Sequence, residues 1–579
     1  MTASFPISKR HYESRFILLI ILVAIAPLLS AQGFLGLTGI PSTMASDDSF
    51  GSFWIDYDGD YDQDLFVVND AGPNQLYRND GGTLVEITTG VLVEDITNSW
   101  GATWGDYDND GDPDVFVANW GTDSSKEVNH LYRNDGADMF TRMDSAGFAG
   151  DLAKSSGCAW ADYDGDGWLD LFVSNGLRAA NQQNYLYRGS PSGLFSRVDA
   201  GSLTSDMFRS SGCAWADFDQ DGDQDLVVIN ENTNNTLYRN NGGIFSALTG
   251  PVSEDGGTSR GASWGDFDND GDLDLYVTNW ANENNFLYVN QDTGFVRQLS
   301  EVSAHGGRSE GSGWADYDND GDLDLLVANW GLQTNFLYRN DGDSFVQITS
   351  DPATTDSGNS VGISWGDFDS DGYPDIYVAQ IDRPSGQENL FYRNTYSGSH
   401  WLKVICEGVS SNRSGIGAKV AVKVKEDWQL REIQSQDGFG GHSGLRAHFG
   451  LGSDSITDQI LISWPSGLFT FVENVNGDQL LMLTEPASAP DPEVFSIPAE
   501  EYEVSDWIGN RLDVHLLDPN FYAVEAILLG PSGKVADRLE LDPWDRKFSL
   551  KIPEGEHRGT YTLQLLTNQG YYRSLIIRR

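Results

Sequence analysis

One pattern recurs seven times along the chain and constrains the fold more than any other feature. It reads G-x-x-W-x-D-aromatic-D-x-D-x-x-x-D, and its first aspartates are separated by 50, 56, 55, 49, 50 and 51 residues. A second pattern, N-x-(L/F)-Y, follows in every unit, and a short apolar run such as DLFVVN lies between the two. Each unit therefore predicts four short strands separated by Gly, Asn and Asp turns. Four strands repeated seven times are typical of a β-propeller.

The ends of the repeat region predict how the ring of blades closes. The seventh unit ends near Asn394 without sequence for its fourth strand, whereas FLGLTGI at residues 34–40 lies ahead of the first unit. We expect this segment to supply the missing strand, which leaves no open sheet edge. The Trp of each unit and the aromatic residue after its first aspartate are expected to pack between blades.

The aspartates of each unit form a nine-residue loop with carboxylates at positions 1, 3, 5 and 9. Ca²⁺ takes six to eight oxygen ligands, and alternate residues of a tight loop can turn their carboxylates inward. Position 7 would contribute its backbone carbonyl, so its side chain can vary. None of the loops contains His or Cys, which transition metals would favour, and Mg²⁺ would demand a stricter octahedral site. The sequence therefore predicts up to seven structural Ca²⁺ sites.

The predicted ligands, taken loop by loop, are Asp56, Asp58, Asp60, Asp62 and Asp64; Asp106, Asp108, Asp110, Asp112 and Asp114; Asp162, Asp164, Asp166, Trp168 and Asp170; Asp217, Asp219, Asp221, Asp223 and Asp225; Asp266, Asp268, Asp270, Asp272 and Asp274; Asp316, Asp318, Asp320, Asp322 and Asp324; and Asp367, Asp369, Asp371, Tyr373 and Asp375. The first loop has Tyr61 at position 6, where the other loops have Gly. Because that position is a sharp turn, we expect this site to be the weakest.

The loops at the opposite end of the blades differ in length and are the candidate recognition surface. They contain Trp120, Trp280 and Trp330, each in an N-W-(G/A) string. Exposed Trp beside amides would suit sugar stacking, which makes these three residues candidate ligand contacts. The alternative is that these Trp side chains wedge between blades.

Charge and cysteine content exclude some classes of partner and of fold. Lys and Arg number 36 against 87 Asp and Glu, a net charge of −51, which argues against nucleic acid and against an anionic membrane surface. The three cysteines are too few for a disulfide framework. Cys158 and Cys213 occupy the same place in two near-identical stretches and are expected to be small core residues.

The amino terminus reads as an export signal over residues 1–31. Lys9, Arg10 and Arg15 precede an apolar run from Phe16 to Leu29, and Ser30-Ala31 follows. That run is shorter than the ~20 residues of a membrane span, so we expect cleavage and no transmembrane segment in the mature chain; an uncleaved anchor is the alternative.

The D-x-D-x-D-G-x-x-D spacing and the blade period resemble the FG-GAP/VCBS repeats of integrin α-subunit propellers over about residues 33–396. The resemblance implies calcium on one face and ligand binding on the other. Residues 398–486 resemble an ASPIC/UnbV domain through Gly415-Ile416-Gly417-Ala418, His448-Phe449-Gly450-Leu451-Gly452 and Trp464-Pro465-Ser466-Gly467. That family implies no established chemistry.

A Pro-rich linker at 487–496 leads to residues 497–579, where apolar and polar residues alternate as in an immunoglobulin-style sandwich. This part resembles the carboxy-terminal sorting domains of the type IX secretion system, although the usual Pro-Asn-Pro opening is missing. An ordinary accessory β-sandwich is the alternative. The resemblance implies a secreted or cell-surface protein of a Bacteroidota-type bacterium.

The predicted fold class is therefore all-β: a seven-bladed β-propeller with Ca²⁺-binding loops, followed by two small β-domains. The predicted function is secreted, calcium-dependent, non-catalytic binding of an extracellular glycan or protein. The alternative is a calcium-dependent polysaccharide lyase, which would need a base and a charge-neutralising group in a cleft. The polar set His442, Arg446 and His448 lacks a nearby nucleophile and base at defined spacing. We assign that set a structural role, and no catalytic residue is predicted.

Overall fold

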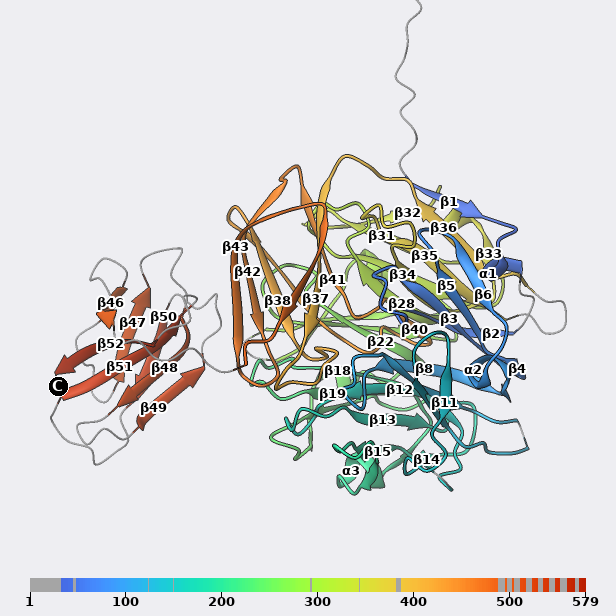
Figure 1. The fold of residues 1–579 in the computed structure, drawn as a ribbon, viewed down its shortest axis with the longest axis horizontal. Coiled ribbons are helices and arrows are strands. Elements are labelled where there is room, and N and C mark those ends of the chain that lie inside the picture. The colour runs from blue at the N-terminus through green and yellow to red at the C-terminus, as the bar shows by residue number, and fades with distance from the viewer. Residues whose placement is uncertain are drawn as a thin grey trace, which may run out of the picture. The chain divides into compact units, whose positions relative to one another are not determined.

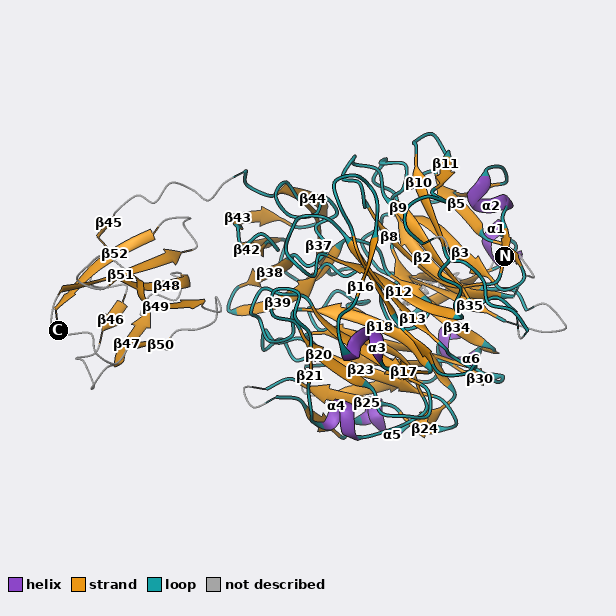
Figure 2. Cartoon of the chain, turned by 90° about the horizontal axis from the view of Figure 1, so that it is seen from below, coloured by secondary structure: helices purple, strands orange, loops and turns teal. Residues whose placement is uncertain are grey.

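The computed structural model describes residues 33–44, 48–122, 124–148, 150–291, 294–342, 344–381 and 387–487, together with eight strands between residues 495 and 578. Strands dominate these residues, and the helices are single turns (Figure 2). The helices are α1 (Pro41–Met44), α2 (Val91–Glu94), α3 (Ser202–Ser205), α4 (Pro251–Glu254), α5 (Glu301–Ala304) and α6 (Pro352–Thr355).

Within the described residues, seven sheets each contain one G-x-x-W-x-D segment as their inner strand. The inner strands are β2 (Ser49–Ile55), β8 (Ser99–Gly105), β12 (Ser155–Ala161), β18 (Ser210–Ala216), β22 (Ser259–Gly265), β28 (Ser309–Ala315) and β34 (Ser360–Gly366). The second strands are β3 (Asp64–Asn69), β9 (Asp114–Asn119), β13 (Asp170–Asn175), β19 (Asp225–Asn230), β23 (Asp274–Asn279), β29 (Asp324–Asn329) and β35 (Asp375–Gln380). The third strands are β5 (Gln75–Asn79), β10 (His130–Asn134), β15 (Tyr185–Arg188), β20 (Thr236–Arg239), β25 (Phe286–Val289), β31 (Phe336–Asn340) and β36 (Leu390–Asn394). The outer strands are β6 (Leu84–Ile87), β11 (Phe140–Arg142), β16 (Ser196–Val198), β21 (Ser246–Ala247), β26 (Val296–Gln298), β32 (Phe345–Ile348) and β1 (Phe34–Leu37).

The sheets form a closed ring of blades. Each inner strand contacts the inner strand of the next sheet, and the last of them, β34, contacts the first, β2. Strand β1 pairs antiparallel with β36, with Phe34 opposite Asn394 and Leu37 opposite Phe391, and the two strands lie side by side in Figure 1. The predicted all-β propeller and its closure by the amino-terminal segment are confirmed.

Aromatic side chains hold neighbouring blades together. The indole N–H of Trp160 donates to the carbonyl of Thr103, 3.2 Å away on the preceding inner strand, and Trp365 donates in the same way to Gly313 at 3.1 Å. The aromatic residue after the first aspartate of a loop stacks on the Trp of the next blade, as Tyr317 does on Trp365 with ring planes 3° apart. The expected packing between blades is confirmed for these residues.

Two-residue strands tie consecutive blades together at the end away from the Asp loops. In each pair, the loop after a second strand joins the segment that precedes the next inner strand. The pairs are β4 (Gly72–Pro73) with β7 (Ile96–Thr97), β14 (Gln182–Gln183) with β17 (Met207–Phe208), β24 (Glu283–Asn284) with β27 (Gly306–Gly307), and β30 (Gln333–Thr334) with β33 (Ser357–Gly358).

The segment after the repeats forms two further sheets, of strand order β41-β37-β44 and β39-β38-β42-β43. Their strands are β37 (His400–Glu407), β38 (Lys419–Val424), β39 (Asp427–Glu432), β41 (Ala447–Gly452), β42 (Ile456–Ser463), β43 (Phe469–Asn476) and β44 (Gln479–Thr484). Their core is continuous with that of the blades, because Trp160 and Leu169 belong to the same buried cluster as Ile416 and Trp464.

The loop between β39 and β41 enters the centre of the ring. Its short strand β40 (Gly441–His442) pairs in parallel with β2, and the Gly438 amide donates to the carbonyl of Ala262 at 3.0 Å. Phe439 is fully buried, with its ring centroid 6.1 Å from that of Phe50. We call residues 434–446 the channel plug, because they contact inner strands from several blades.

The glycine at the third position of the inner strands makes room for this plug. A Cβ atom at Gly261 or Gly311 would lie 2.7 Å from backbone atoms of Phe439, and one at Gly51 would lie 2.8 Å from the carbonyl oxygen of Gly440. These distances are shorter than real Cβ contacts allow. The recurring glycine of the first pattern is therefore required by long-range packing as well as by the blade itself.

The eight strands beyond residue 494 form two sheets of order β45-β52-β51-β48-β49 and β46-β47-β50. They are β45 (Phe495–Ser496), β46 (Tyr502–Val504), β47 (Arg511–Leu516), β48 (Ala523–Leu529), β49 (Val535–Glu540), β50 (Lys547–Lys551), β51 (Thr560–Thr567) and β52 (Tyr572–Arg578). The predicted export signal at residues 1–31 and most of the predicted linker lie outside the described residues.

Candidate metal centres and ligand face

Each Asp loop is folded by hydrogen bonds from its own backbone to its carboxylates. In the second loop, Asp106 accepts from the amides of Asp110 and Gly111 at 3.0 and 2.8 Å. The last aspartate, Asp114, accepts from the amides of Tyr107 at 3.2 Å and Asn134 at 2.8 Å, so its own loop and the third strand β10 fix its position. The alternating aspartates therefore follow a tight turn whose geometry the loop itself maintains.

The structure brings the carboxylates of positions 1, 3 and 9 together. In each group, one oxygen from every aspartate lies within 4.8 Å of the others, an arrangement that could hold a metal ion. Five of the groups are Asp56, Asp58 and Asp64; Asp106, Asp108 and Asp114; Asp162, Asp164 and Asp170; Asp217, Asp219 and Asp225; and Asp266, Asp268 and Asp274.

Positions 5 and 7 do not belong to these five groups. The carboxylate at position 5 accepts a hydrogen bond from the amide of position 7, as Asp110 does from Asp112 at 3.0 Å. At position 7 of the last loop, the Tyr373 hydroxyl donates to the carbonyl of Ser399 at 2.9 Å. Metal ligation at positions 5 and 7 stays a prediction.

The grouped carboxylates are crowded and largely removed from water. Burial, with a smaller contribution from neighbouring aspartates, raises the pKa of Asp64 to about 8 and that of Asp225 to about 9. Buried oxygens of Asp108, Asp164 and Asp225 have no hydrogen-bond partner. Unpartnered buried oxygens beside like charges are costly without a cation. The donor set therefore fits a hard divalent cation.

The arginine that follows N-x-(L/F)-Y also contacts the Asp loops, a contact not predicted above. Arg188 Nε lies 2.7 Å from Asp164, and Arg393 Nε lies 2.6 Å from Asp369. The signal was present as the string L-Y-R or F-Y-R, which recurs in most repeats. The arginine partly offsets the negative charge of position 3.

The backbone of the first loop differs from that of the other loops at position 6, as its sequence predicts. Tyr61 has φ +73°, in the left-handed region, whereas Gly111 and Gly321 have φ +106° and +107° at the same position. A side chain in this region is strained. The geometry therefore supports the expectation that this site is the weakest.

The second domain packs on the end of the ring that carries the Asp loops. Lys419 Nζ lies 2.7 Å from Asp217, Arg446 Nη2 lies 3.1 Å from Asp56, and Lys403 forms an ion pair with Asp367. Each of these aspartates occupies position 1 of its loop. Lysine and arginine side chains of this domain thus neutralise part of the acidic face.

The polar set in the second domain contacts both its own domain and the Asp loops of the ring. His442 Nε2 lies 2.8 Å from the carbonyl oxygen of Gln434, and His448 Nε2 lies 2.7 Å from Asn319 Oδ1. A cavity of about 130 Å³ between this domain and the ring is lined by Lys403, Arg446 and His448, among others.

The three Trp residues proposed as ligand contacts differ in exposure. Trp120 is only 6% exposed, stacks on Trp100 with centroids 4.4 Å apart, and donates its indole N–H to the carbonyl of Leu177 at 2.8 Å. For Trp120 the structure therefore favours the packing alternative. Trp280 and Trp330 remain half-buried at the end of the ring opposite the Asp loops.

Cys158, Cys213 and Cys406 are buried free thiols, as expected for the first two. Among the described residues, we find no helix with the length and apolar character needed to cross a membrane.

Comparisons with known proteins agree with the repeat and domain pattern. A family model described as FG-GAP-like repeat matches residues 56–117, 106–173, 217–277 and 316–378, and one described as ASPIC and UnbV matches residues 408–490. Cartilage acidic protein 1 of Homo sapiens is 27% identical over 158 residues, an alignment that covers 27% of this chain and only 23% of that protein.

Two solved structures are also similar. BBS1N in complex with ARL6DN matches with a TM-score of 0.41 and 10% identity, covering 62% of this chain and 96% of that one. The V. cholerae biofilm matrix protein Bap1 matches with a TM-score of 0.31 and 12% identity, covering 95% of this chain and 76% of that one. From the two family matches, this chain carries FG-GAP-like repeats followed by an ASPIC/UnbV domain.

Proposed function

We propose that this protein is an extracellular, non-catalytic ligand-binding or adhesion protein whose Asp loops hold structural Ca²⁺. Grouped carboxylates in the Asp loops, with unpartnered buried oxygens in several of them, support a divalent cation. A set of oxygen ligands without His or Cys favours Ca²⁺ over transition metals. The bound ion would stabilise each loop by neutralising carboxylates that repel one another.

The position of the ASPIC/UnbV domain is our main reason for placing the ligand-binding face at the end of the ring opposite the Asp loops. This domain contacts position 1 of several Asp loops, and its plug enters the channel from that end. The face at the opposite end keeps loops of unequal length and the half-buried rings of Trp280 and Trp330. We infer that a glycan or protein partner binds there.

The test is retention of the purified protein on immobilised polysaccharides and matrix proteins in millimolar Ca²⁺. Retention on one class of ligand, abolished by Trp280→Ala or Trp330→Ala, is the expected result. Circular dichroism with and without chelator separates loss of binding from loss of fold. Absence of retention on every support would refute the proposed binding function.

The same samples test the lyase alternative. A polysaccharide lyase breaks the glycosidic bond by elimination, and the new double bond absorbs ultraviolet light. Release of such ends from any retained polysaccharide would replace the adhesion proposal with the enzymatic one. Retention without release supports adhesion.

A further inference from the structure

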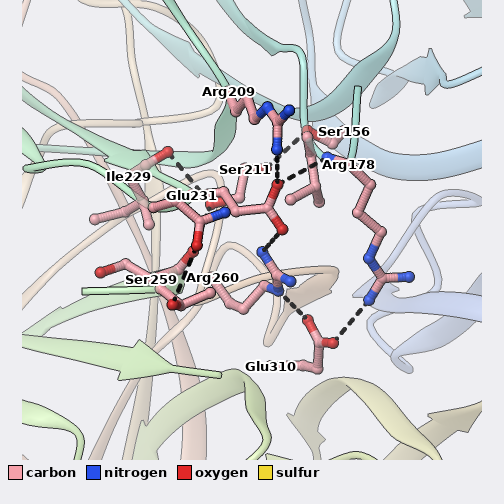
Figure 3. Close-up of polar contacts among 12 residues, drawn as sticks. Ser156, Arg178, Arg209, Ser211, Ile229, Glu231, Ser259, Arg260 and Glu310 are labelled. Carbon is pink, nitrogen blue, oxygen red and sulfur yellow. Dashed lines mark hydrogen bonds and ion pairs between the residues drawn. The ribbon is translucent and has the colours of Figure 1, made fainter. Parts of the chain in front are cut away.

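The channel mouth opposite the Asp loops holds a dense group of charged side chains. We call Arg178, Arg209, Glu231, Arg260 and Glu310 the mouth cluster; Figure 3 shows them converging from several blades. Elsewhere acids outnumber bases, since the chain carries a net charge of −51. A local excess of arginine is therefore unusual in this molecule.

The repeat architecture places these residues together, although they lie far apart in the sequence. Arg260 and Glu310 are the second residues of the inner strands β22 and β28, a position that Trp100 and Ser211 occupy in other blades. Glu231 directly follows the second strand β19. Equivalent positions of a closed ring converge at the channel mouth.

The inner residues of the mouth cluster, Arg260, Glu231 and Glu310, are joined by ion pairs. Arg260 and Glu310 are 2% and 0% exposed, with Arg260 Nε 3.2 Å from Glu310 Oε2. Arg260 Nη1 lies 3.0 Å from Glu231 Oε1. A buried arginine shared by two glutamates is rigid, and it fixes where both carboxylates lie.

Two outer arginines share the same glutamates but remain open to solvent. Arg178 Nη2 lies 3.0 Å from Glu310 Oε1, and its side chain is 32% exposed. Arg209 Nη1 lies 3.6 Å from Glu231 Oε2, and its side chain is 42% exposed. A guanidinium has five N–H donors, so a single ion pair does not use its full capacity.

The backbone of Arg178 is itself unusual. Its φ of +55° lies in the left-handed region, where side chains other than those of Gly, Asn and Asp are uncommon. Its amide donates to Glu231 at 3.3 Å, which ties the strained residue to the cluster. Strain of this kind persists where the surrounding structure enforces it, and it concentrates at functional sites.

Indole rings lie beside the arginines. The guanidinium carbon of Arg178 is 5.8 Å from the ring centroid of Trp330, and that of Arg308 is 5.3 Å from Trp280. The buried indole nitrogen of Trp280 has no hydrogen-bond partner. Half-buried indole faces beside planar cations offer both an apolar surface and anion-binding donors.

We propose that the channel mouth binds the carboxylate of an acidic sugar at the end of a glycan. Arg178 and Arg209 pair with the carboxylate, whose planar geometry matches the guanidinium fork, and Trp280 and Trp330 pack against the sugar ring. Three arginines pair with two glutamates, and Arg308 lies beside Trp280, which leaves positive charge for an anion. The proposal rests on the binding function proposed above and specifies its ligand class.

The overall negative charge restricts the ligand to one or a few carboxylates. A long polyanion would be repelled by the acidic surface, whereas the field of a distant charge is screened within about 8 Å at physiological salt. A single terminal acidic sugar meets the arginines without crossing that surface. The same argument disfavours nucleic acids.

The experiment is calorimetric titration of the Ca²⁺-loaded protein with uronic acid trisaccharides, namely galacturonate, glucuronate and guluronate. Each titration is repeated with the carboxyl-reduced, neutral trisaccharide. We expect binding of at least one acidic trisaccharide and at least about tenfold weaker binding of its reduced form, as for loss of a charged hydrogen bond.

Variants then locate the site. Arg178→Gln is expected to weaken binding of the acidic trisaccharide about tenfold or more. The matched control is Arg197→Gln, which removes the same charge from a side chain that is 39% exposed on the outer strand β16. Arg209→Gln provides a second test if Arg178→Gln lowers the melting temperature.

The outcomes separate this inference from the proposed function. Equal affinity for acidic and reduced sugars, or equal loss in Arg178→Gln and Arg197→Gln, would overturn the mouth as the acidic-sugar site. If none of the three acidic trisaccharides binds, but the protein is retained on a neutral glycan or a protein support, the acidic-sugar site is refuted and the binding function is still supported. If the protein binds no trisaccharide and is retained on no support, both the acidic-sugar site and the binding function are refuted.

Discussion

Replacing Phe439 with alanine would test whether the plug fills the centre of the ring. The Phe439 side chain is 0% exposed and shares a buried cluster with Phe50, Trp100 and Val361, which belong to three different inner strands. An aromatic side chain buries about 150–250 Å², and at about 25 cal/mol per Å² this corresponds to about 4–6 kcal/mol. Alanine keeps part of that area, so the expected loss is about 3–5 kcal/mol, the range for Phe→Ala in protein cores.

The assay is urea unfolding at fixed Ca²⁺ concentration, because metal binding itself shifts the folding equilibrium. Hydrogen exchange provides a local readout, since the Ser52 amide donates to the carbonyl of Gly440 at 2.9 Å. Loss of the plug should expose this amide and speed its exchange. An increase in exchange at Ser52 would assign the destabilisation to the channel.

The matched control is Leu299→Ala, at a position that is 83% exposed and should change stability by less than about 0.5 kcal/mol. If Phe439→Ala were as mild as this control and left the exchange of Ser52 unchanged, the plug would not contribute to the ring. The packing argument would then be refuted for this loop.

Three further perturbations test the loops and the second domain. Tyr61→Gly should stabilise the first loop by about 1 kcal/mol, because it relieves a side chain at φ +73°; differential scanning calorimetry in Ca²⁺ measures this, and a lower melting temperature would contradict it. Chelation with EGTA should lower the melting temperature, since each site at ~100 times its dissociation constant adds about 2.7 kcal/mol; identical melting with EGTA and CaCl₂ would count against structural Ca²⁺. Glu485→Gln should cost about 1.5–3 kcal/mol at pH 7, because the carboxylate accepts from three backbone amides, including that of Ser411 at 2.8 Å. Burial alone would raise the pKa of Glu485, but the hydrogen bonds, from Ser466 first, lower it below its usual value. The Glu485 contribution is thus present above the unfolded pKa and is lost as pH falls through the folded pKa, so urea unfolding at pH 7 and pH 3 should show the variant and the wild type converging at acid pH.

Local features of the repeat were readable from the sequence. The spacing of Trp54, Asp56 and Asp64 predicts a strand, a turn and a second strand, because these elements depend on residues a few positions apart. The closure was also predictable, since the last unit lacks a fourth strand and the strand-like segment at 34–40 precedes the first unit. Repetition made each prediction stronger than a single copy would allow.

The functional residues were predictable to different degrees. The Asp ligands at positions 1, 3 and 9 converge as their spacing suggests, whereas Trp120 lies in the core although its motif is the same as that of Trp330. The same short sequence has different surroundings in different blades, because the neighbouring loops differ from blade to blade. Burial of a loop residue therefore needs the structure.

The β class, the order of the strands, the closing strand and the oxygen ligands of the Asp loops could all be derived from the amino-acid sequence, because they follow from short-range spacing and its repetition. The folded molecule was needed to see that residues 434–446 fill the channel and that Arg178 contacts Glu310, 132 positions away. Such contacts leave no repeating pattern in the amino-acid sequence. They arise when ring closure brings equivalent positions of different blades to one point, and when a separate domain packs on one face of the ring.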